Sequence, residues 1–301
     1  MLHFTLRQLQ VFEKVASHLN YSRAAEELYL SQPAVSMQIK QIEGHIGLPL
    51  FEQMGKKIYL TEAGHELFHY ARSIAQQLSE MEALFDEMKG LGKGKLILSV
   101  VNTANYFTSQ LLAKFCQRNP NINVILQVAN RDAVLKQLSD NSTDLAIMGQ
   151  PPEGLDLTAE SFMQNPLVVV ADPAHPLATQ RHIKFTKLEN ETFVTREKGS
   201  GTRIAMERVF AEHGVHPRIS METETNEAIK QAVRAGMGLG ILSLHSIELE
   251  LETHRLVTLD VEHFPLLRHW FVAHRSNKRL SSAAIAFKDF LLTESGKVDR
   301  S

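Results

Sequence analysis

The chain has 301 residues, of which 44% are hydrophobic, so it can bury a substantial core and is long enough for two or three folded units. Its formal net charge of -2 and pI near 6.7 exclude a chain that is basic throughout, so any contact with nucleic acid must come from a local cluster of cations. The single cysteine, Cys116, excludes an internal disulfide. No signal peptide or membrane-spanning run is recognisable, so we expect a cytoplasmic globular protein with no membrane partner.

Two short helical patterns joined by a tight turn lie between Ser22 and Ile46. We expect Ser22 to cap the first helix and Ser31 to cap the second, in which Pro33 is tolerated in the first turn. Apolar residues recur at helical spacing, at Ala24, Ala25, Leu28, Val35, Ile39, Ile42 and Ile46. With an earlier apolar stripe at residues 9–16, this pattern predicts a helix-turn-helix, whose second helix presents polar residues to the major groove of DNA.

The second helix carries polar or flexible side chains on the face away from its apolar stripe, namely Gln32, Ser36, Met37 and Lys40. Such groups can reach base edges and phosphates, although an amphipathic helix that simply meets water would show the same pattern. Residues 51–60 then predict a small β-wing with a glycine turn and with Lys56 and Lys57 at its tip. A basic wing beside a groove helix supplies phosphate contacts, which favours DNA binding.

The segment AAEELYLSQPAVSMQIKQIEGHIGLPLFEQ, followed by LTEAG at residues 60–64, resembles the N-terminal signature of the LysR-type transcriptional regulators. The resemblance implies a mainly α-helical winged helix-turn-helix. Together with the polar face of the second helix, it gives the candidate DNA-binding residues Ser31, Gln32, Pro33, Ala34, Ser36, Met37, Lys40, Lys56 and Lys57. The chain departs from the family at Met37, where many relatives carry a basic or amide residue, and at Gln53, where many carry arginine. Methionine can contact a thymine methyl group but cannot form a bidentate pair with guanine.

A second motif points to different chemistry, because His65-Glu66-Leu67-Phe68-His69 fits the H-E-x-x-H pattern of zinc metallohydrolases. After the expected N-cap Thr61, however, apolar residues recur alternately three and four positions apart, at Leu67, Ala71, Ile74, Leu78, Met81, Phe85 and Met88. This heptad seam predicts a dimerising linker helix over residues 61–89 and places both histidines on its outer face, away from any cleft that could shape a metal site. We therefore expect no metal and no catalytic residues.

Three glycines within residues 90–94 predict a hinge, because such a run cannot propagate a helix. From Lys95 onwards strand-like and helical patterns alternate in two sets, which argues for a parallel α/β sheet in each of two lobes. We expect a DNA-binding domain over residues 1–60 and an effector-binding domain over residues 95–301. The family resemblance implies a periplasmic-binding-protein-like (type 2) effector domain, with lobe I at about 95–163 and 267–293 and lobe II at about 164–266.

A small ligand is expected at the carboxyl ends of the strands, beside helix N-termini that favour anions. The loop at residues 195–203 combines hydroxyls, glycines and cations just before a helix, which suits a phosphate or carboxylate; an ordinary solvated connection is the alternative. The candidate effector-binding residues are Asn102, Thr103, Asn130, Thr195, Arg196, Ser200, Gly201, Thr202, Arg203 and Asn226. The glycines of residues 236–240 follow a helix and precede a strand, the reverse of a dinucleotide fingerprint, so Gly236 is expected to end a helix.

The same loop, and SQPAVSMQIKQIEG in the helix-turn-helix, are similar to those of LysR-type regulators of RuBisCO operons. This resemblance implies a regulator, mainly an activator, of carbon-dioxide-fixation genes that responds to a small anionic or phosphorylated metabolite or to NADPH. It also implies a homodimer or homotetramer on double-stranded promoter DNA, contact with RNA polymerase, and no cofactor. Three alternatives stay open: a LysR-type regulator of another metabolic operon, a pure solute-binding role for the cleft domain, and, as the least favoured, a zinc metallohydrolase that uses His65, Glu66 and His69.

Overall fold

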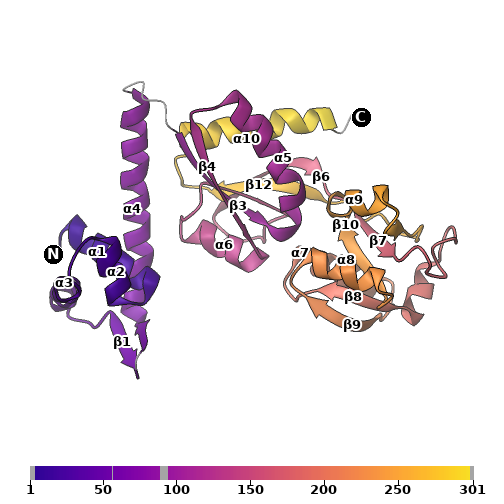
Figure 1. The fold of residues 1–301 in the computed structure, drawn as a ribbon, viewed down its shortest axis with the longest axis horizontal. Helices are drawn as coiled ribbons and strands as arrows, with labels where there is room; N and C mark the ends of the chain where they lie inside the picture. Colours follow the sequence, from indigo (N-terminus) through magenta and orange to yellow (C-terminus); the bar gives the residue numbers. More distant parts are fainter. Residues whose placement is uncertain (1–3, 56, 89–93, 299–301) are drawn as a thin grey trace. The chain divides into compact units, whose positions relative to one another are not determined.

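A computed structural model describes residues 4–55, 57–88 and 94–298, without the side chains of residues 79, 80, 83, 84, 86–88 and 295–298 (Figure 1). The chain divides into two compact units. Met1–Lys89 with Asp140–Ser142 form the first, and Gly90–Ser139 with Thr143–Ser301 form the second. Among the described helices, none combines the length and apolarity that crossing a bilayer requires.

The first unit contains three short helices, a hairpin and one long helix. These are α1 (Leu6–His18), α2 (Tyr21–Glu27), α3 (Gln32–Ile46), β1 (Phe51–Met54), β2 (Lys57–Leu60) and α4 (Glu62–Met88). Ser31 caps α3, since its hydroxyl accepts a hydrogen bond from Ala34 N. The expectation that Ser22 caps α2 is wrong, because α2 begins at Tyr21 and Asn20 Oδ1 accepts from Ser22 N and Arg23 N.

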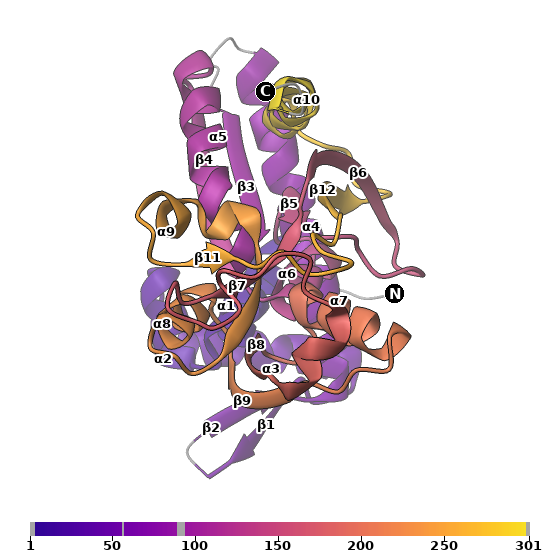
Figure 2. The same cartoon turned by 90° about the vertical axis from the view of Figure 1, so that its right-hand side faces the viewer.

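One hydrophobic core joins the helices of this unit. Its buried members include Phe12 and Val15 of α1, Ile39 and Ile42 of α3, and Leu50. The hairpin β1–β2 is antiparallel, with Met54 opposite Lys57, and it projects away from helices α1–α3 (Figure 2). The apolar spacing of α3 therefore buries one face of that helix and leaves the opposite face to solvent.

Lobe I of the second unit is built on a five-stranded sheet of order β4-β3-β5-β12-β6. Its strands are β3 (Gly94–Val101), β4 (Ile122–Ala129), β5 (Leu145–Met148), β6 (Leu157–Gln164) and β12 (His269–Arg275), and its helices are α5 (Asn105–Arg118), α6 (Arg131–Ser139) and α10 (Ser282–Val298). Strands β3, β4 and β5 are parallel, whereas β12 is antiparallel to both β5 and β6. The prediction of a parallel sheet is thus wrong for this edge, because the chain returns to lobe I along β12 in the opposite direction.

Lobe II repeats this mixed arrangement in the order β11-β7-β10-β8-β9. Its elements are β7 (Leu167–Ala171), β8 (Thr192–Arg196), α7 (Gly201–Glu212), β9 (Arg218–Thr223), α8 (Asn226–Arg234), β10 (Leu239–Ser243), α9 (Glu248–Glu252) and β11 (Val257–Thr258). Strand β8 is parallel to β9 and β10, but β7 is antiparallel to β10 and β11. Gly236 follows the end of α8 with a φ of 78°, as a helix-terminating glycine does.

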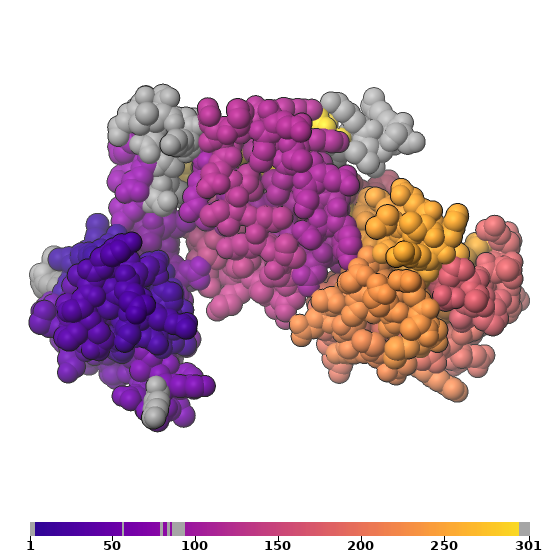
Figure 3. Space-filling view, viewed as in Figure 1, coloured from indigo at the N-terminus to yellow at the C-terminus, as the bar shows by residue number. Residues whose placement is uncertain are grey.

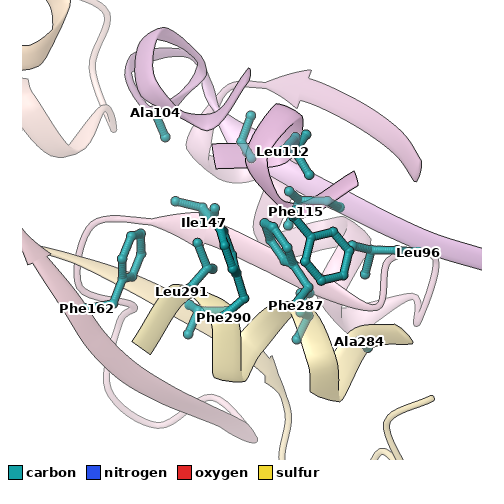
Figure 4. Close-up of a cluster of buried hydrophobic side chains, with 14 of the residues drawn as sticks. Leu96, Ala104, Leu112, Phe115, Ile147, Phe162, Ala284, Phe287, Phe290 and Leu291 are labelled. Carbon is teal, nitrogen blue, oxygen red and sulfur yellow. The ribbon is translucent and has the colours of Figure 1, made fainter. Parts of the chain in front are cut away.

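Each lobe has its own core, and Figure 3 shows the lobes as separate masses, magenta and orange. In lobe I the rings of Phe115 on α5 and of Phe287 and Phe290 on α10 pack together over the sheet (Figure 4). Phe115 meets Phe287 edge to face, with ring centroids 5.0 Å apart. Cys116 is half-buried and packs against this cluster.

Two neighbouring segments carry the chain between the lobes. Asn165 N donates to Arg268 O at 2.7 Å, and Leu167 and Leu266 exchange backbone hydrogen bonds of 3.0 and 2.9 Å. The outgoing and returning chains are therefore hydrogen-bonded to each other where lobe I meets lobe II. Side chains from these two segments are held close to both lobes.

Candidate DNA-binding and effector-binding sites

The exposed face of α3 carries the residues expected to contact DNA. Ser31, Gln32, Pro33, Met37 and Lys40 are exposed, and Ala34 and Ser36 are half-buried. On the opposite side of the helix Val35, Ile39 and Ile42 are buried in the core of the first unit. The core thus fixes the orientation of α3 and presents these side chains together on one face.

The wing places one described cation beside a glycine turn. Lys57 is exposed at the start of β2, and Gly55 adopts a φ of 65° in the turn. Gln53 Nε2 donates to Gly55 O at 3.0 Å, so the side chain at the position where relatives carry arginine braces the turn in this chain. Lys56 lies outside the described residues.

The heptad seam of α4 has two parts with different surroundings. Ala71 is only 1% exposed, and Leu67 and Ile74 are half-buried against the core of the first unit. Leu78 is half-buried, Met81 is 47% exposed and Phe85 is 49% exposed, whereas the side chain of Met88 lies outside the described residues. Only the second part of the seam therefore has apolar side chains that face solvent in a single chain.

The two histidines of the H-E-x-x-H pattern also lie on α4. His65 is exposed, and the ring of His69 meets the edge of Tyr70 at a centroid distance of 5.8 Å. Within residues 4–55, 57–88 and 94–298 there is no group of three His, Cys, Asp or Glu side chains arranged to hold a metal ion.

A cleft in the second unit is lined by residues of both lobes and of the segments that join them. Its lining consists of Val101, Asn102, Thr103, Asn130, Arg131, Gly149, Asn165, Arg196, Ser200, Gly201, Thr202, Arg268 and Trp270. Seven residues predicted from the sequence are among them: Asn102, Thr103, Asn130, Arg196, Ser200, Gly201 and Thr202. Thr195, Arg203 and Asn226 are not.

Arg196 lies in the cleft wall, but its charge is already paired. Its Nε and Nη2 donate to the two carboxylate oxygens of Glu197 at 2.7 and 2.8 Å. Its Nη1 donates to Asn226 Oδ1 at 2.9 Å and to Thr103 Oγ1 at 3.3 Å. Asn226 Nδ2 also donates to Thr103 Oγ1, at 3.2 Å. Since Thr103 belongs to lobe I, whereas Arg196 and Asn226 belong to lobe II, the two bonds to Thr103 Oγ1 join the lobes.

Arg203 is not among the residues that line the cleft, contrary to the expectation from the sequence. Its Nε donates to Glu207 Oε1 at 2.6 Å, one turn further along α7, and its Nη1 donates to Thr195 Oγ1. Arg203 and Thr195 therefore hold the start of α7 on β8. They support the loop rather than line the cleft.

Arg131 and Arg268 supply the positive charge of the cleft, and neither was predicted from the sequence. Arg268 Nη1 donates to Gly201 O at 2.9 Å, and Arg131 Nη2 donates to Gln150 O at 3.0 Å. A Cβ atom placed on Gly201 would lie 3.2 Å from Arg268 Nη2 and 3.6 Å from Arg131 Nη1, so both guanidinium groups converge on the first residue of α7. In the described part of the chain, neither group forms an ion pair with a carboxylate.

The electrostatics of the cleft follow from these unpaired charges. Burial, together with the positive charges of Arg131 and Arg208, lowers the pKa of Arg268 to about 10. Burial also lowers the pKa of Arg131, an effect that the neighbouring Asp132 partly offsets. The N-terminus of α7 adds backbone N–H groups that lack carbonyl partners within the helix. Both arginines stay protonated at neutral pH, so the cleft favours an anion.

A helix-turn-helix unit combined with a two-lobed domain that carries an anion-favouring cleft defines a ligand-responsive DNA-binding regulator. Residues 6–65 match the model described as "Bacterial regulatory helix-turn-helix protein, lysR family", and residues 89–296 match the LysR substrate binding domain. The chain therefore belongs to the LysR family of transcriptional regulators, and the predicted fold class is confirmed.

Relatives and solved structures agree with this assignment. The chain is 55% identical over 297 residues to a RuBisCO operon transcriptional regulator of Allochromatium vinosum, covering 99% of this chain and 98% of that protein. It is 44% identical to the HTH-type transcriptional activator CmpR of Synechocystis sp., over 97% of this chain and 96% of that protein. The CcmR regulatory domain of Synechocystis PCC6803 in complex with 2-PG is similar with a TM-score of 0.65 and 42% identity, over 67% of this chain and 97% of that domain. Full-length CbnR complexed with target DNA shares the fold, with a TM-score of 0.72 and 19% identity over 97% of this chain and all (100%) of that chain.

Proposed function

We propose that this LysR-family regulator controls carbon-dioxide-fixation genes, chiefly as an activator of a RuBisCO operon, and that a small phosphorylated or otherwise anionic metabolite tunes its hold on promoter DNA. The names of the relatives support the choice of genes, and the 2-PG complex of the CcmR regulatory domain supports the choice of ligand. The observation that carries the proposal is the convergence of Arg131 and Arg268 on the N-terminus of α7.

The chemistry of this corner suits a phosphate or carboxylate. Two guanidinium groups without carboxylate partners offer charge-assisted hydrogen bonds, and the helix N-terminus adds N–H donors aligned with a favourable dipole. An anion bound there replaces the water that burial removes from Arg268. NADPH is the other effector that the family resemblance implies.

The same arrangement suggests how binding of the anion changes the interaction with DNA. Arg131 comes from lobe I, the α7 N-terminus from lobe II, and Arg268 from a segment that joins them. An anion held by all three biases the relative orientation of the lobes, in competition with the Thr103 bonds to Arg196 and Asn226. A shift in lobe orientation then changes the spacing or bend that paired subunits impose on promoter DNA.

The DNA-binding part of the proposal rests on α3 and the wing. The exposed face of α3 enters the major groove, and Lys57 contacts phosphate. Two chains pair through the exposed apolar residues Met81 and Phe85 of α4, which gives a homodimer and, by a further contact, a homotetramer. Working in the cytoplasm on double-stranded DNA, the assembly recruits RNA polymerase. The proposed working units are residues 1–60, 61–89 and 95–301, and the hinge expected at 90–94 lies largely outside the described residues.

The proposal is tested by calorimetric titration of 2-PG into the full chain. We expect saturable binding that Arg268→Met abolishes. Arg234→Met removes one exposed arginine of α8 and serves as the charge-matched control, which should bind as the parent does. Equal binding by both variants would show that the anion is held elsewhere. The choice of operon is tested separately, by footprinting on the promoter region of the RuBisCO genes.

A further inference from the structure

Two buried polar atoms beside the arginines form no hydrogen bond with the protein. Within residues 4–55, 57–88 and 94–298, no partner reaches Asn165 Oδ1 or Trp270 Nε1. Asn165 is 1% exposed and Trp270 is 2% exposed, and both line the cleft. Natural proteins leave few such atoms unpaired, because a buried donor or acceptor that loses water without gaining a partner is unfavourable. Both atoms therefore call for a partner that is not part of this chain.

The backbone holds these two side chains next to the anion-binding arginine. Asn165 N donates to Arg268 O, and Trp270 lies two residues after Arg268 at the start of β12. The indole ring packs against Phe107, with ring centroids 5.3 Å apart, so packing fixes its orientation. Neither residue carries a charge, so neither adds to the attraction for the anion itself.

The chemistry of Asn165 Oδ1 and Trp270 Nε1 indicates which kind of ligand group could form hydrogen bonds with them. The indole Nε1–H can only donate a hydrogen bond, and an amide carbonyl oxygen can only accept one. Phosphate and carboxylate oxygens can satisfy the indole, but an ionised anion has no proton for the amide oxygen. An alcohol hydroxyl both donates and accepts, so it can satisfy either atom.

We propose that Asn165 and Trp270 are specificity-determining residues that recognise a hydroxyl group on the effector, so that this cleft selects hydroxylated phosphates over phosphates of the same size and charge without hydroxyls. The inference rests on the proposed anion site and adds to it a second point of recognition. Ordered water would satisfy the same atoms equally well, and in that case hydroxylated and plain phosphates bind alike.

A matched pair of ligands tests the inference. Glycerol 3-phosphate and propyl phosphate have the same carbon chain and charge but differ in their hydroxyl groups. Calorimetric titration of the full chain should give a Kd at least about ten-fold lower for glycerol 3-phosphate, because a site built to bond a hydroxyl leaves polar atoms unpaired with the analogue that lacks it. Equal Kd values would overturn the inference and leave the anion site standing.

Variants separate recognition from a structural role. Asn165→Leu should reduce the ratio of the two Kd values to below about three, with the Kd for propyl phosphate unchanged. Since Asn165 Oδ1 is buried without a hydrogen-bond partner in the described chain, this variant should melt no lower than the parent. Trp270→Phe keeps the packing on Phe107 and should lower the ratio as well.

Ser243→Ala is the control, because Ser243 is also buried with an unpaired hydroxyl but does not line the cleft. Its ratio should equal that of the parent, and a ratio that falls as far as in Asn165→Leu would overturn the inference. If neither phosphate binds, or if Arg268→Met binds both as the parent does, the anion site fails and the hydroxyl inference fails with it.

Discussion

Replacing Arg268 by methionine should stabilise the protein while it removes effector binding. Methionine keeps much of the aliphatic length of the side chain but not its charge. The Arg268 guanidinium is mostly buried and lies near Arg131 and Arg208, both positive. Its charge is therefore unfavourable for folding and useful only when an anion is present.

The size of the effect follows from the pKa. In the folded protein the pKa of Arg268 is lowered from its usual range to about 10, which corresponds to about 3 kcal/mol of destabilisation at neutral pH. Because the folded pKa is lower than the unfolded one, this penalty is complete below about pH 10 and fades as the pH rises above that value. Loss of the hydrogen bond to Gly201 O and residual screening by solvent offset part of the gain. We expect a net gain of about 1 kcal/mol, or roughly 2–4 °C in the melting temperature.

Differential scanning calorimetry at pH 7, with and without 2-PG, measures both consequences. The parent should melt at a higher temperature with ligand, by the equivalent of about 2.7 kcal/mol at a ligand concentration a hundred times the Kd. Arg268→Met should have a higher melting temperature than the parent without 2-PG, and adding 2-PG should not raise it. A variant that melts several degrees below the parent would refute the reasoning, since it would mean that Arg268 stabilises the ligand-free fold.

Four further results are expected. Lys57→Ala should weaken promoter binding and lower the slope of log Kd against log salt by about one in an anisotropy titration. Lys14→Ala, which removes the α1 lysine that pairs with Glu27 of α2, should leave the slope unchanged. Gly149→Ala should weaken effector binding about ten-fold in a calorimetric titration, with little change in melting temperature. The added methyl group would lie 2.6 Å from Arg268 Nη2 and must displace this flexible guanidinium group. An unchanged Kd would contradict the role of Arg268 in holding the effector. Tyr29→Asn should raise the free energy of unfolding by about 0.5–1 kcal/mol, measured by guanidinium denaturation. Tyr29 is 96% exposed and has a φ of 55°, a backbone conformation that asparagine adopts more readily than tyrosine. A loss of stability would show that the tyrosine ring makes stabilising contacts. Phe85→Asp should shift the chain towards the monomer in sedimentation velocity, because a charge replaces an apolar side chain of the seam. Glu82→Asp on the same helix is the control and should leave the oligomeric state unchanged. If Phe85→Asp leaves the oligomer intact, the subunits pair through a different surface.

Local patterns predicted the DNA-binding unit well, because its helices bury faces that are visible in the spacing of single residues. Val35, Ile39 and Ile42 are buried as their spacing requires, and Ser31 caps α3. The cap of α2 was misplaced because Asn20 and Ser22 are both good caps. Only the backbone reveals that Leu19 adopts a left-handed conformation and ends α1 just before Asn20.

Strand direction was predicted only in part. Alternating strands and helices correctly indicate the parallel pairs β3–β4 and β8–β9. The direction of β12 depends on how the chain returns from lobe II, which no local pattern encodes. The strand β6 was also missed, because LTAESFMQ mixes polar and apolar residues without a clear alternation.

The candidate effector site was predicted at the level of the loop but not of the charges. Composition identified the cations near Gly201, yet it could not show that Glu197 and Glu207 already pair with Arg196 and Arg203. Arg268 reaches Gly201 from 67 positions away in the chain. A cation at the start of the returning strand was the one signal in the sequence that could have drawn attention to it.

The most direct test of the central claim is a footprint of the full chain on the promoter of a RuBisCO operon, measured without and with 2-PG. The account predicts protection in both states, with a ligand-dependent change in the length or spacing of the protected region that Arg268→Met loses. An identical footprint in both states for a parent protein that binds 2-PG would contradict the claim that the anion in the cleft controls how the protein holds its DNA.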